Sequence, residues 1–142
     1  MSRSLDDLCP TFRKFAVELI AHATEQGIPV MIIDTLRTEE EQAVNLANGV
    51  SWTKNSKHLP QLDCDACGPL GGMSHAIDLA PYEEYRLHGS DKLNWNAMDP
   101  VWEKLCVIGE TLSLRCGHRW QKRDSGHFEM RETPVGFGIA EE

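Results

Sequence analysis

Two short segments of the chain alternate between apolar and polar side chains, and the polar positions of both carry groups that bind metal ions. In residues 75–80 (HAIDLA), Ile77 and Leu79 lie on one face of a strand, and Asp78 lies on the other with two small alanines, because strand side chains alternate. In residues 127–131 (HFEMR), the apolar side chains lie opposite His127 and Glu129. The alternation therefore predicts two strands with one face on a core and one face that displays carboxylates and an imidazole.

Periodic apolar residues predict three helices and two further short strands. The second helix opens with Thr38 and Glu41, the T-x-x-E pattern of a capping box, and Asp99-Pro100 supplies an N-cap and a first-turn proline for the third. The helices are expected over residues 10–26, over 38–48 and from residue 99 onward, and the strands at 29–34 and about 112–116. We expect an α+β fold, with a small, mostly antiparallel sheet and helices packed on one side.

The chain has 142 residues, a length typical of one domain. We expect residues 1–142 to form a single domain with its core over about 10–131, a loop rich in glycine and proline at about 59–73, and a loose tail over 134–142. The net charge of −8 does not suit a nucleic-acid-binding protein, and no apolar run is long enough to span a membrane. We therefore expect a monomer with no nucleic-acid partner and no membrane insertion.

A metal site on the polar face needs a third ligand besides Asp78 and His127, because catalytic zinc sites use three protein ligands and leave one position open. His75 lies three residues from Asp78, which places it on the opposite face of a strand. His58 lies in the loop sequence SKH, which can fold back over the sheet. The spacing therefore favours His58, with Asp78 and His127, as the metal ligands.

The same residues resemble a family motif. Zinc peptidases of the LAS group, the D-Ala-D-Ala carboxypeptidase and L-Ala-D-Glu endopeptidase family, carry S-x-H-x-x-G-x-A-x-D and, later, D/E-x-x-H. This chain has SKH at 56–58, SHAID at 74–78 and DSGH at 124–127. Residues 27–42 also resemble the family's strand and Arg-bearing turn. The resemblance extends from about residue 10 to 131, is closest to small phage endolysins, and implies the LAS (hedgehog/D-Ala-D-Ala peptidase-like) fold.

The resemblance implies a role for each matched residue. His58, Asp78 and His127 match the zinc ligands, so Zn²⁺ is the expected cofactor. Asp124 matches the catalytic carboxylate, and Arg37 matches an arginine that stabilises the oxyanion or orients the substrate carbonyl. The chemistry agrees, because zinc lowers the pKa of its bound water to about 7. A nearby carboxylate can take that water's proton, and a guanidinium can stabilise negative charge.

Five further residues are expected to contact the substrate or to orient the metal ligands through a contact with them. They are Ser56, Gln42, His75, Trp120 and Glu129. His75 and His118 fit a supporting or surface role better than that of a ligand. Glu129 fits an exposed strand residue equally well.

The chain departs from the motif at several points. His58 and Asp78 are 20 residues apart, a much longer gap than the motif has, so residues 59–73 form an insertion that is expected beside the metal. Ser74 stands where the motif has glycine, and residues 116–120 read CGHRW where the family often has W-G-G-x-W. Cys64 and Cys67 form a lone C-x-x-C, interpreted as free thiols because no second pair completes a zinc site.

The resemblance implies a zinc-dependent peptidase of peptidoglycan stem peptides, most closely an L-alanyl-D-glutamate endopeptidase of phage or prophage origin. Two alternatives stay open. A D-alanyl-D-alanine carboxypeptidase or dipeptidase uses the same ligands, and an inactive wall-binding module keeps the metal but does not need Asp124. Because the N-terminus has no apolar signal segment, we expect synthesis in the cytoplasm and release to the cell wall through a separate pore.

Overall fold

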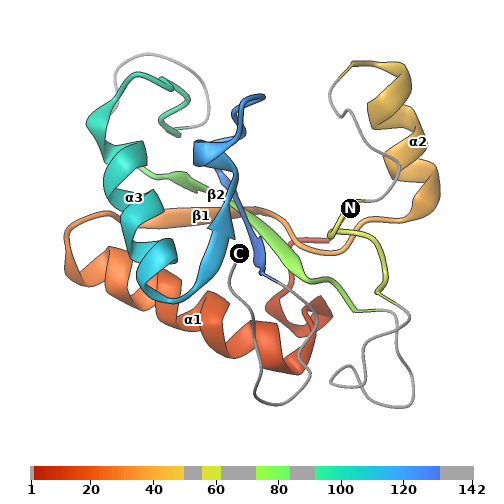
Figure 1. The fold of residues 1–142 in the computed structure, drawn as a ribbon, viewed down its shortest axis with the longest axis horizontal. Helices are drawn as coiled ribbons and strands as arrows, with labels where there is room; N and C mark the ends of the chain where they lie inside the picture. The colour runs from red at the N-terminus through yellow and green to blue at the C-terminus, as the bar shows by residue number, and fades with distance from the viewer. Residues whose placement is uncertain (1, 50–55, 62–72, 84–91, 132–142) are drawn as a thin grey trace.

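The computed structural model describes residues 2–49, 56–61, 73–83 and 92–131, and a four-stranded sheet lies at its centre (Figure 1). The strands are β1 (Val30–Asp34), β2 (Ala76–Pro81), β3 (Leu114–Cys116) and β4 (His127–Met130). Their order across the sheet is β1-β2-β4-β3, so the two alternating segments β2 and β4 lie side by side in the middle. Each neighbouring pair is antiparallel, in agreement with the prediction.

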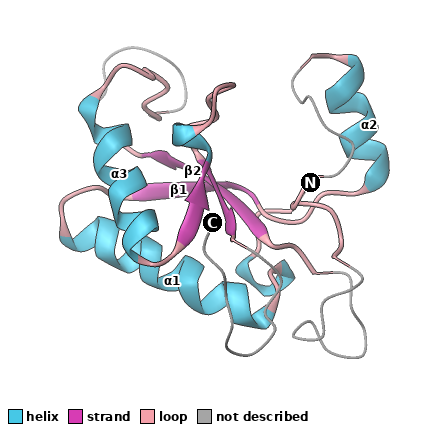
Figure 2. Cartoon of the chain, viewed as in Figure 1, coloured by secondary structure: helices cyan, strands magenta, loops and turns pink. Residues whose placement is uncertain are grey.

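Two helices cover one side of the sheet, and a third stands apart (Figures 1 and 2). α1 (Pro10–Glu25) and α3 (Pro100–Thr111) pack against each other and against the strands. The short turns η1 (Leu5–Asp7) and η3 (Gly117–Arg119) precede α1 and follow β3. α2 (Glu39–Ala47) follows β1 and stands away from the sheet. The predicted α+β class is confirmed, and the one-sided packing is made by α1 and α3.

The apolar faces of the two central strands supply much of the core. Ile77 and Leu79 of β2 and Phe128 of β4 are fully buried, and Ile77 is the register partner of Phe128. Gly109 lets α3 approach this face closely, because a Cβ at that position would lie 2.8 Å from the Phe128 ring. The predicted alternation of apolar and polar faces is therefore present in β2 and β4.

Local hydrogen bonds fix where α2 and α3 begin. The Thr38 side chain accepts from the backbone N–H of Glu41 at 3.0 Å, and the Glu41 carboxylate accepts from the N–H of Thr38 at 2.9 Å. This is the reciprocal pattern of a capping box. The Asp99 side chain accepts from a first-turn N–H of α3 at 2.9 Å. Both predicted helix starts are confirmed, and that of α2 comes directly after Arg37.

The predicted insertion leaves the fold and returns to it at one place. The Gln61 N–H donates to the Met73 carbonyl at 3.1 Å, so the two ends of the segment meet. The segments 62–72, with Cys64 and Cys67, and 134–142 lie outside the described residues. Within the described part of the chain, no helix is long and apolar enough to cross a bilayer.

Candidate active site

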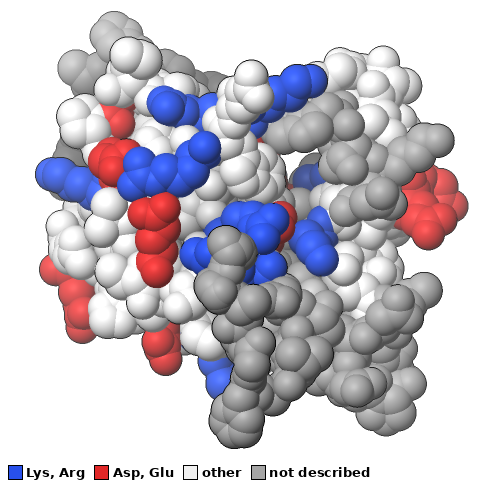
Figure 3. Space-filling model, viewed as in Figure 1, with Lys and Arg blue, Asp and Glu red and all other residues white. Residues whose placement is uncertain are grey.

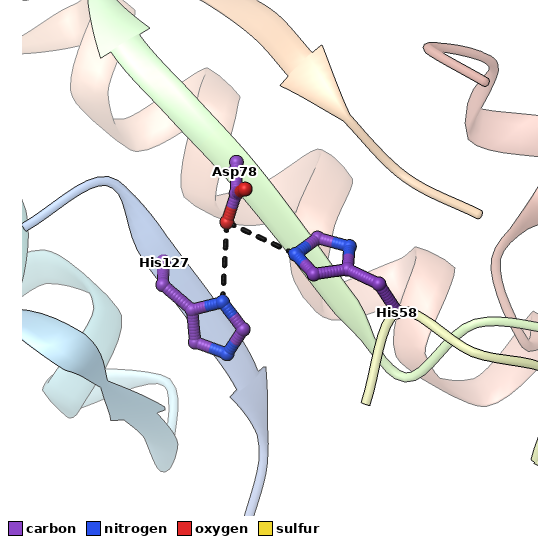
Figure 4. Close-up of side chains that lie close together, drawn as sticks. All are labelled: His58, Asp78 and His127. Atoms are coloured by element: carbon purple, nitrogen blue, oxygen red, sulfur yellow. Dashed lines mark hydrogen bonds and ion pairs between the residues drawn. The ribbon is translucent and has the colours of Figure 1, made fainter. Parts of the chain in front are cut away.

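Three ligand-type side chains meet on the polar face of the sheet (Figure 4). Asp78 of β2 and His127 of β4 are cross-strand partners, so the antiparallel register points both side chains to the same face. His58 reaches them from the loop over residues 56–61. Nε2 of His58 lies 3.0 Å from Oδ1 of Asp78, and Nδ1 of His127 lies 3.1 Å from the same oxygen. The three ligand atoms lie within 4.8 Å of one another, so they could hold one metal ion.

Backbone hydrogen bonds hold His58 over the sheet in spite of the long insertion. The His75 N–H donates to the Lys57 carbonyl, and the Arg37 N–H donates to the His58 carbonyl, both at 2.9 Å. The Ser56 hydroxyl accepts from the His58 N–H at 3.1 Å, which closes a small turn before the ligand. The loop therefore joins the start of β2 to the turn after β1, and the insertion begins and ends beyond this junction.

The second ring nitrogen of each histidine determines which atom can bind a metal. Nδ1 of His58 lies 2.7 Å from the Thr35 carbonyl oxygen, which can only accept, so Nδ1 carries the proton. Nε2 of His127 lies 2.7 Å from Oε1 of Glu129 and donates to it in the same way. In the neutral rings, both remaining nitrogens direct lone pairs at the Asp78 carboxylate. Such acceptors repel one another unless a proton or a cation lies between them, so the donor set fits a metal ion.

The electrostatics of the cluster point the same way. Burial opposes the ionised form of Asp78, but His58 and His127 hold its pKa well below the usual range. Burial also opposes the charged form of His127, yet hydrogen bonds to Asp78 and Glu129 raise its pKa to about 10. A proton on His127 thus supplies the positive charge that the two carboxylates need, and a metal ion can supply it instead.

Arg37 is clamped beside the cluster. Its Nε donates to Oδ2 of Asp34 at 3.0 Å, its Nη2 donates to the same oxygen, and its Nη1 donates to Oε1 of Gln42. Asp34 and Gln42 are both buried. Nη2 lies 3.9 Å from Oδ2 of Asp78, so the guanidinium faces the cluster. These partners use three of its five N–H groups, which leaves two for an oxygen of the substrate.

Asp34 belongs to the site although no sequence motif indicates it. It is 1% exposed, its register partner is Asp78, and the β-bulge after Ile32 sets its place at the end of β1. Burial raises the pKa of Asp34 although His58 and Arg37 oppose the shift. A carboxylate that ends an apolar strand, three residues before an arginine, is the sequence signal that could have indicated it.

Asp124 lies next to the cluster in the turn before β4. Its Oδ2 is 3.9 Å from Nδ1 of His127, and its side chain is 44% exposed. Partial burial and the charge of Asp78 raise its pKa. The Asp124 N–H donates to the Gly117 carbonyl at 2.9 Å, and a Cβ on Gly117 would lie 2.3 Å from the Asp124 carbonyl oxygen. The turn therefore presents an accessible carboxylate that holds a proton more firmly than an ordinary aspartate does.

The other predicted residues lie around this centre. The rings of Trp120 and His127 have centroids 5.0 Å apart. His75 is buried outside the three-ligand group, and burial, together with the charge of Lys57, lowers its pKa to about 4. Direct contacts to a ligand or to Arg37 are made by Ser56, Gln42, Glu129 and Trp120.

Comparison with protein families gives this arrangement a context. The family model of the phage L-alanyl-D-glutamate peptidase matches residues 2–136. The chain belongs to this family. Membership in the L-alanyl-D-glutamate peptidase family confirms the resemblance that the motifs at 56–58, 74–78 and 124–127 indicate.

Two phage proteins named L-alanyl-D-glutamate peptidase are similar to the chain in sequence. That of Escherichia phage T5 is 27% identical over 118 residues, which cover 78% of this chain and 72% of the T5 protein. That of Listeria phage A118 is 39% identical over 61 residues, which cover 41% of this chain and 22% of the A118 protein. The crystal structure of the Serratia marcescens L-Ala D-Glu endopeptidase ChiX matches with a TM-score of 0.61 at 17% identity, over 91% of this chain and 86% of ChiX. This last likeness supports the fold.

Proposed function

We propose that the chain is a zinc-dependent endopeptidase that hydrolyses the L-alanyl-D-glutamate bond of peptidoglycan stem peptides. Family membership supports the peptidase activity and the choice of bond. The observation that carries the proposal is the site itself. Three ligand atoms meet within 4.8 Å, beside the accessible carboxylate of Asp124 and the clamped guanidinium of Arg37.

The donor set favours zinc among the divalent metals. Imidazole nitrogens and a carboxylate oxygen are the ligands of catalytic zinc sites, which leave one position open. Nε2 of His58, the Asp78 carboxylate and Nδ1 of His127 would hold the ion. The second nitrogens of the two rings are bonded to Thr35 and Glu129, which fixes the orientation of each ring. A bound zinc ion supplies Lewis acidity and lowers the pKa of water.

The chain's own residues account for proton transfer and charge stabilisation. Asp124 takes a proton from the attacking water and passes it to the leaving amine of D-glutamate. Its raised pKa suits this exchange, because a carboxylate with firmer hold on a proton is a stronger base. The N–H groups of Arg37 that Asp34 and Gln42 do not use stabilise the negative charge that develops on the scissile carbonyl oxygen.

Digestion of purified peptidoglycan, followed by mass spectrometry of the fragments, tests the choice of bond. We expect new fragments with an amino-terminal glutamate, their loss on treatment with a chelator, and their return when zinc is added. Release of terminal D-alanine alone would overturn the proposal. It would identify the chain as the D-alanyl-D-alanine carboxypeptidase or dipeptidase that shares the ligand set.

Substitution of Asp124 separates an enzyme from an inactive wall-binding module. We expect Asp124→Asn to lower kcat by about 100-fold or more, because general acid–base groups contribute on that order. Elemental analysis should still find about one zinc per chain in this variant and no zinc in His58→Ala. Equal hydrolysis before and after Asp124→Asn would contradict the catalytic assignment.

We further propose that residues 1–142 work as a monomeric domain on the cell wall, after synthesis in the cytoplasm and release through a separate pore. The peptidoglycan bond that the family name implies supports the place of action. Light scattering of the purified chain tests the monomer. Lysis of expressing cells only when a pore-forming protein is expressed with the chain tests the route.

A further inference from the structure

We propose that His118 and Ser125 form a positioning pair that holds the Asp124 turn in place for proton transfer. The inference rests on the proposed function, because it depends on the catalytic role of Asp124. Nδ1 of His118 lies 2.9 Å from Oγ of Ser125, the residue that directly follows Asp124. The proposed mechanism does not otherwise use this buried histidine, so its hydrogen bond to the catalytic turn calls for an explanation.

His118 is anchored at its other end on α3. Its side chain is 7% exposed, and Nε2 lies 3.3 Å from Oε1 of Glu103. Arg119 donates to both oxygens of Glu103, at 2.9 and 2.7 Å, and to Glu110 further along α3 at 3.0 Å. Such a bidentate pair fixes the plane of a carboxylate. The Glu103 oxygen that faces His118 is therefore held at a defined point on the helix.

The direction of the two hydrogen bonds of His118 follows from the groups that its nitrogens face, Glu103 on one side and Ser125 on the other. The Glu103 carboxylate only accepts, so Nε2 of His118 carries the proton and faces it. In the neutral ring, Nδ1 of His118 is then the acceptor, and the Ser125 hydroxyl donates to it. A planar ring that is buried and bonded at both nitrogens is a rigid link, so it transmits the position of α3 to the turn.

Backbone hydrogen bonds hold both ends of the turn but not its middle. The Asp124 N–H donates to the Gly117 carbonyl at 2.9 Å, and the Gly126 carbonyl accepts from Leu79 of β2 at 2.8 Å. The contact with β2 is tight, since a Cβ on Gly126 would lie 2.4 Å from the Leu79 carbonyl oxygen. The hydroxyl of Ser125 adds a third attachment between these two. A turn held at three points keeps the Asp124 carboxylate near His127, and misplacement by about 1 Å can lower a rate about 100-fold.

The sequence places His118 where the family pattern has a different residue type. His118 stands in CGHRW, where the family often has W-G-G-x-W, so the corresponding position in that pattern is a glycine. A glycine has no ring to bond the Ser125 hydroxyl. The His118–Ser125 pair is therefore an addition to the motif that the family resemblance describes.

Four substitutions remove or keep each bond separately. Ser125→Ala removes the hydroxyl, and Ser125→Thr retains one. Gln places its amide near the position of Nε2 of a histidine and Asn near that of Nδ1, so His118→Gln keeps only the bond to Glu103 and His118→Asn only the bond to Ser125. We expect kcat to fall about 10- to 100-fold in Ser125→Ala and His118→Gln. We expect kcat close to the original in Ser125→Thr. His118→Asn keeps the bond to Ser125 but loses the anchor on α3, so its kcat should fall by less than that of His118→Gln. KM and zinc content should be unchanged in all four.

Thr24→Ala is the matched control. It removes a hydroxyl that donates to the Ile20 carbonyl at 2.8 Å on α1, and it should leave kcat unchanged. In an Asp124→Asn background, Ser125→Ala should have no further effect, because the residue that Ser125 positions no longer transfers a proton.

Three outcomes overturn the inference while the proposed function stands. The first is an unchanged kcat in Ser125→Ala, and the second is a loss that multiplies with that of Asp124→Asn. A loss of kcat that comes with loss of zinc also overturns it, because the pair would then support the fold or the metal. If Asp124→Asn alone leaves hydrolysis intact, the catalytic assignment of Asp124 fails, and the inference that rests on it fails as well.

Discussion

At the scale of single residues, the orientation of Arg37 depends on a carboxylate that does not meet the substrate. Asp34 accepts from two nitrogens of the guanidinium, so Asp34→Asn removes the charge that holds them. We expect kcat/KM to fall about 10- to 100-fold, as it does when a catalytic group is misplaced. Because Asp34 acts through Arg37, the double variant with Arg37→Lys should be little worse than Arg37→Lys alone. Steady-state kinetics of the four proteins measure this coupling.

An exposed pair of the same chemistry is the control for Asp34. Nη1 of Arg13 lies 3.9 Å from Oδ1 of Asp6, whose side chain is 90% exposed. Exposed pairs contribute little, so Asp6→Asn should leave kcat/KM unchanged. Strictly additive losses from Asp34→Asn and Arg37→Lys would show that Asp34 does not act through the arginine.

Substitution of Glu129, whose carboxylate accepts from His127, is expected to change metal affinity rather than the rate of hydrolysis. Glu129 accepts from Nε2 of His127 and makes Nδ1 a better donor to the ion. We expect Glu129→Gln to weaken zinc binding about 10- to 100-fold, the usual effect of removing such a partner. Competition with a chelating dye measures the affinity.

The exposed pair of His22 and Glu25 on α1, 3.8 Å apart, is the matched control. Glu25→Gln should leave zinc affinity unchanged. If Glu129→Gln binds zinc as tightly as the original chain, the carboxylate serves only the packing of β4.

The residues that the sequence predicts and the one that it misses differ for a physical reason. Asp78 and His127 follow from strand alternation, which assigns a face without any knowledge of the fold. Asp34 does not, because a bulge in β1 decides where its side chain points. The partner of His58 is the carbonyl oxygen of Thr35, and every residue type has such an oxygen, so no sequence pattern can mark it.

At the scale of elements, α2 supports the site through its first turn. The helix buries Gln42, the acceptor for Arg37, and its capping box starts one residue after that arginine. We expect Thr38→Ala to destabilise the cap by about 1 kcal/mol. Backbone amides of residues 39–47 should then exchange faster, and kcat/KM should fall because Gln42 no longer stays in place. Hydrogen exchange followed by mass spectrometry measures the first effect.

The N-cap of η1 provides the comparison for Thr38. The Ser4 hydroxyl accepts from the Asp6 N–H at 3.1 Å, a bond of the same kind, and Ser4→Ala should leave the exchange of α2 unchanged. Faster exchange over 39–47 with unaltered kcat/KM would show that α2 does not steady the arginine.

Sequence patterns predicted the helices and the packing of α1 and α3 on one side of the sheet, but not the position of α2. α1 and α3 carry apolar stripes, and both lie on the sheet. In α2, the buried residue is the polar Gln42, so no apolar stripe directs this helix to the core. The two ends of the insertion are joined by a hydrogen bond from the Gln61 N–H to the Met73 carbonyl. The sequence could not predict this bond either, because it uses backbone groups alone.

At the scale of the whole molecule, the net charge is −8, but charged side chains are distributed unevenly over the face shown in Figure 3. Basic side chains gather in the middle of that face, and many of the acidic ones lie toward its edges, over α2 among other places. Long-range attraction to an anionic wall is weak for a chain of this charge. Short-range contacts with substrate carboxylates can still be favourable where the basic groups gather.

A metal ion at the proposed site would have to displace a proton from His127, so its effect on stability should depend on pH. Without zinc, the raised pKa of His127, about 10, contributes stability that is fully present below the ordinary pKa of 6.5. That contribution is lost as the pH rises through about 10. Zinc must displace this proton, so its affinity should rise up to about tenfold for each pH unit below that point.

We therefore expect the difference in Tm between the zinc-loaded and chelator-treated protein to grow from pH 6 to pH 9. At a free zinc concentration about 1,000 times the Kd, the stabilisation should reach about 4 kcal/mol. Titration calorimetry at pH 7.5 in buffers of different ionisation enthalpy should find about one proton released per zinc from His127. His22→Gln, which alters a half-exposed histidine on α1, should behave like the original chain. A Tm difference that is constant across this range would mean that His127 carries no proton that zinc must displace.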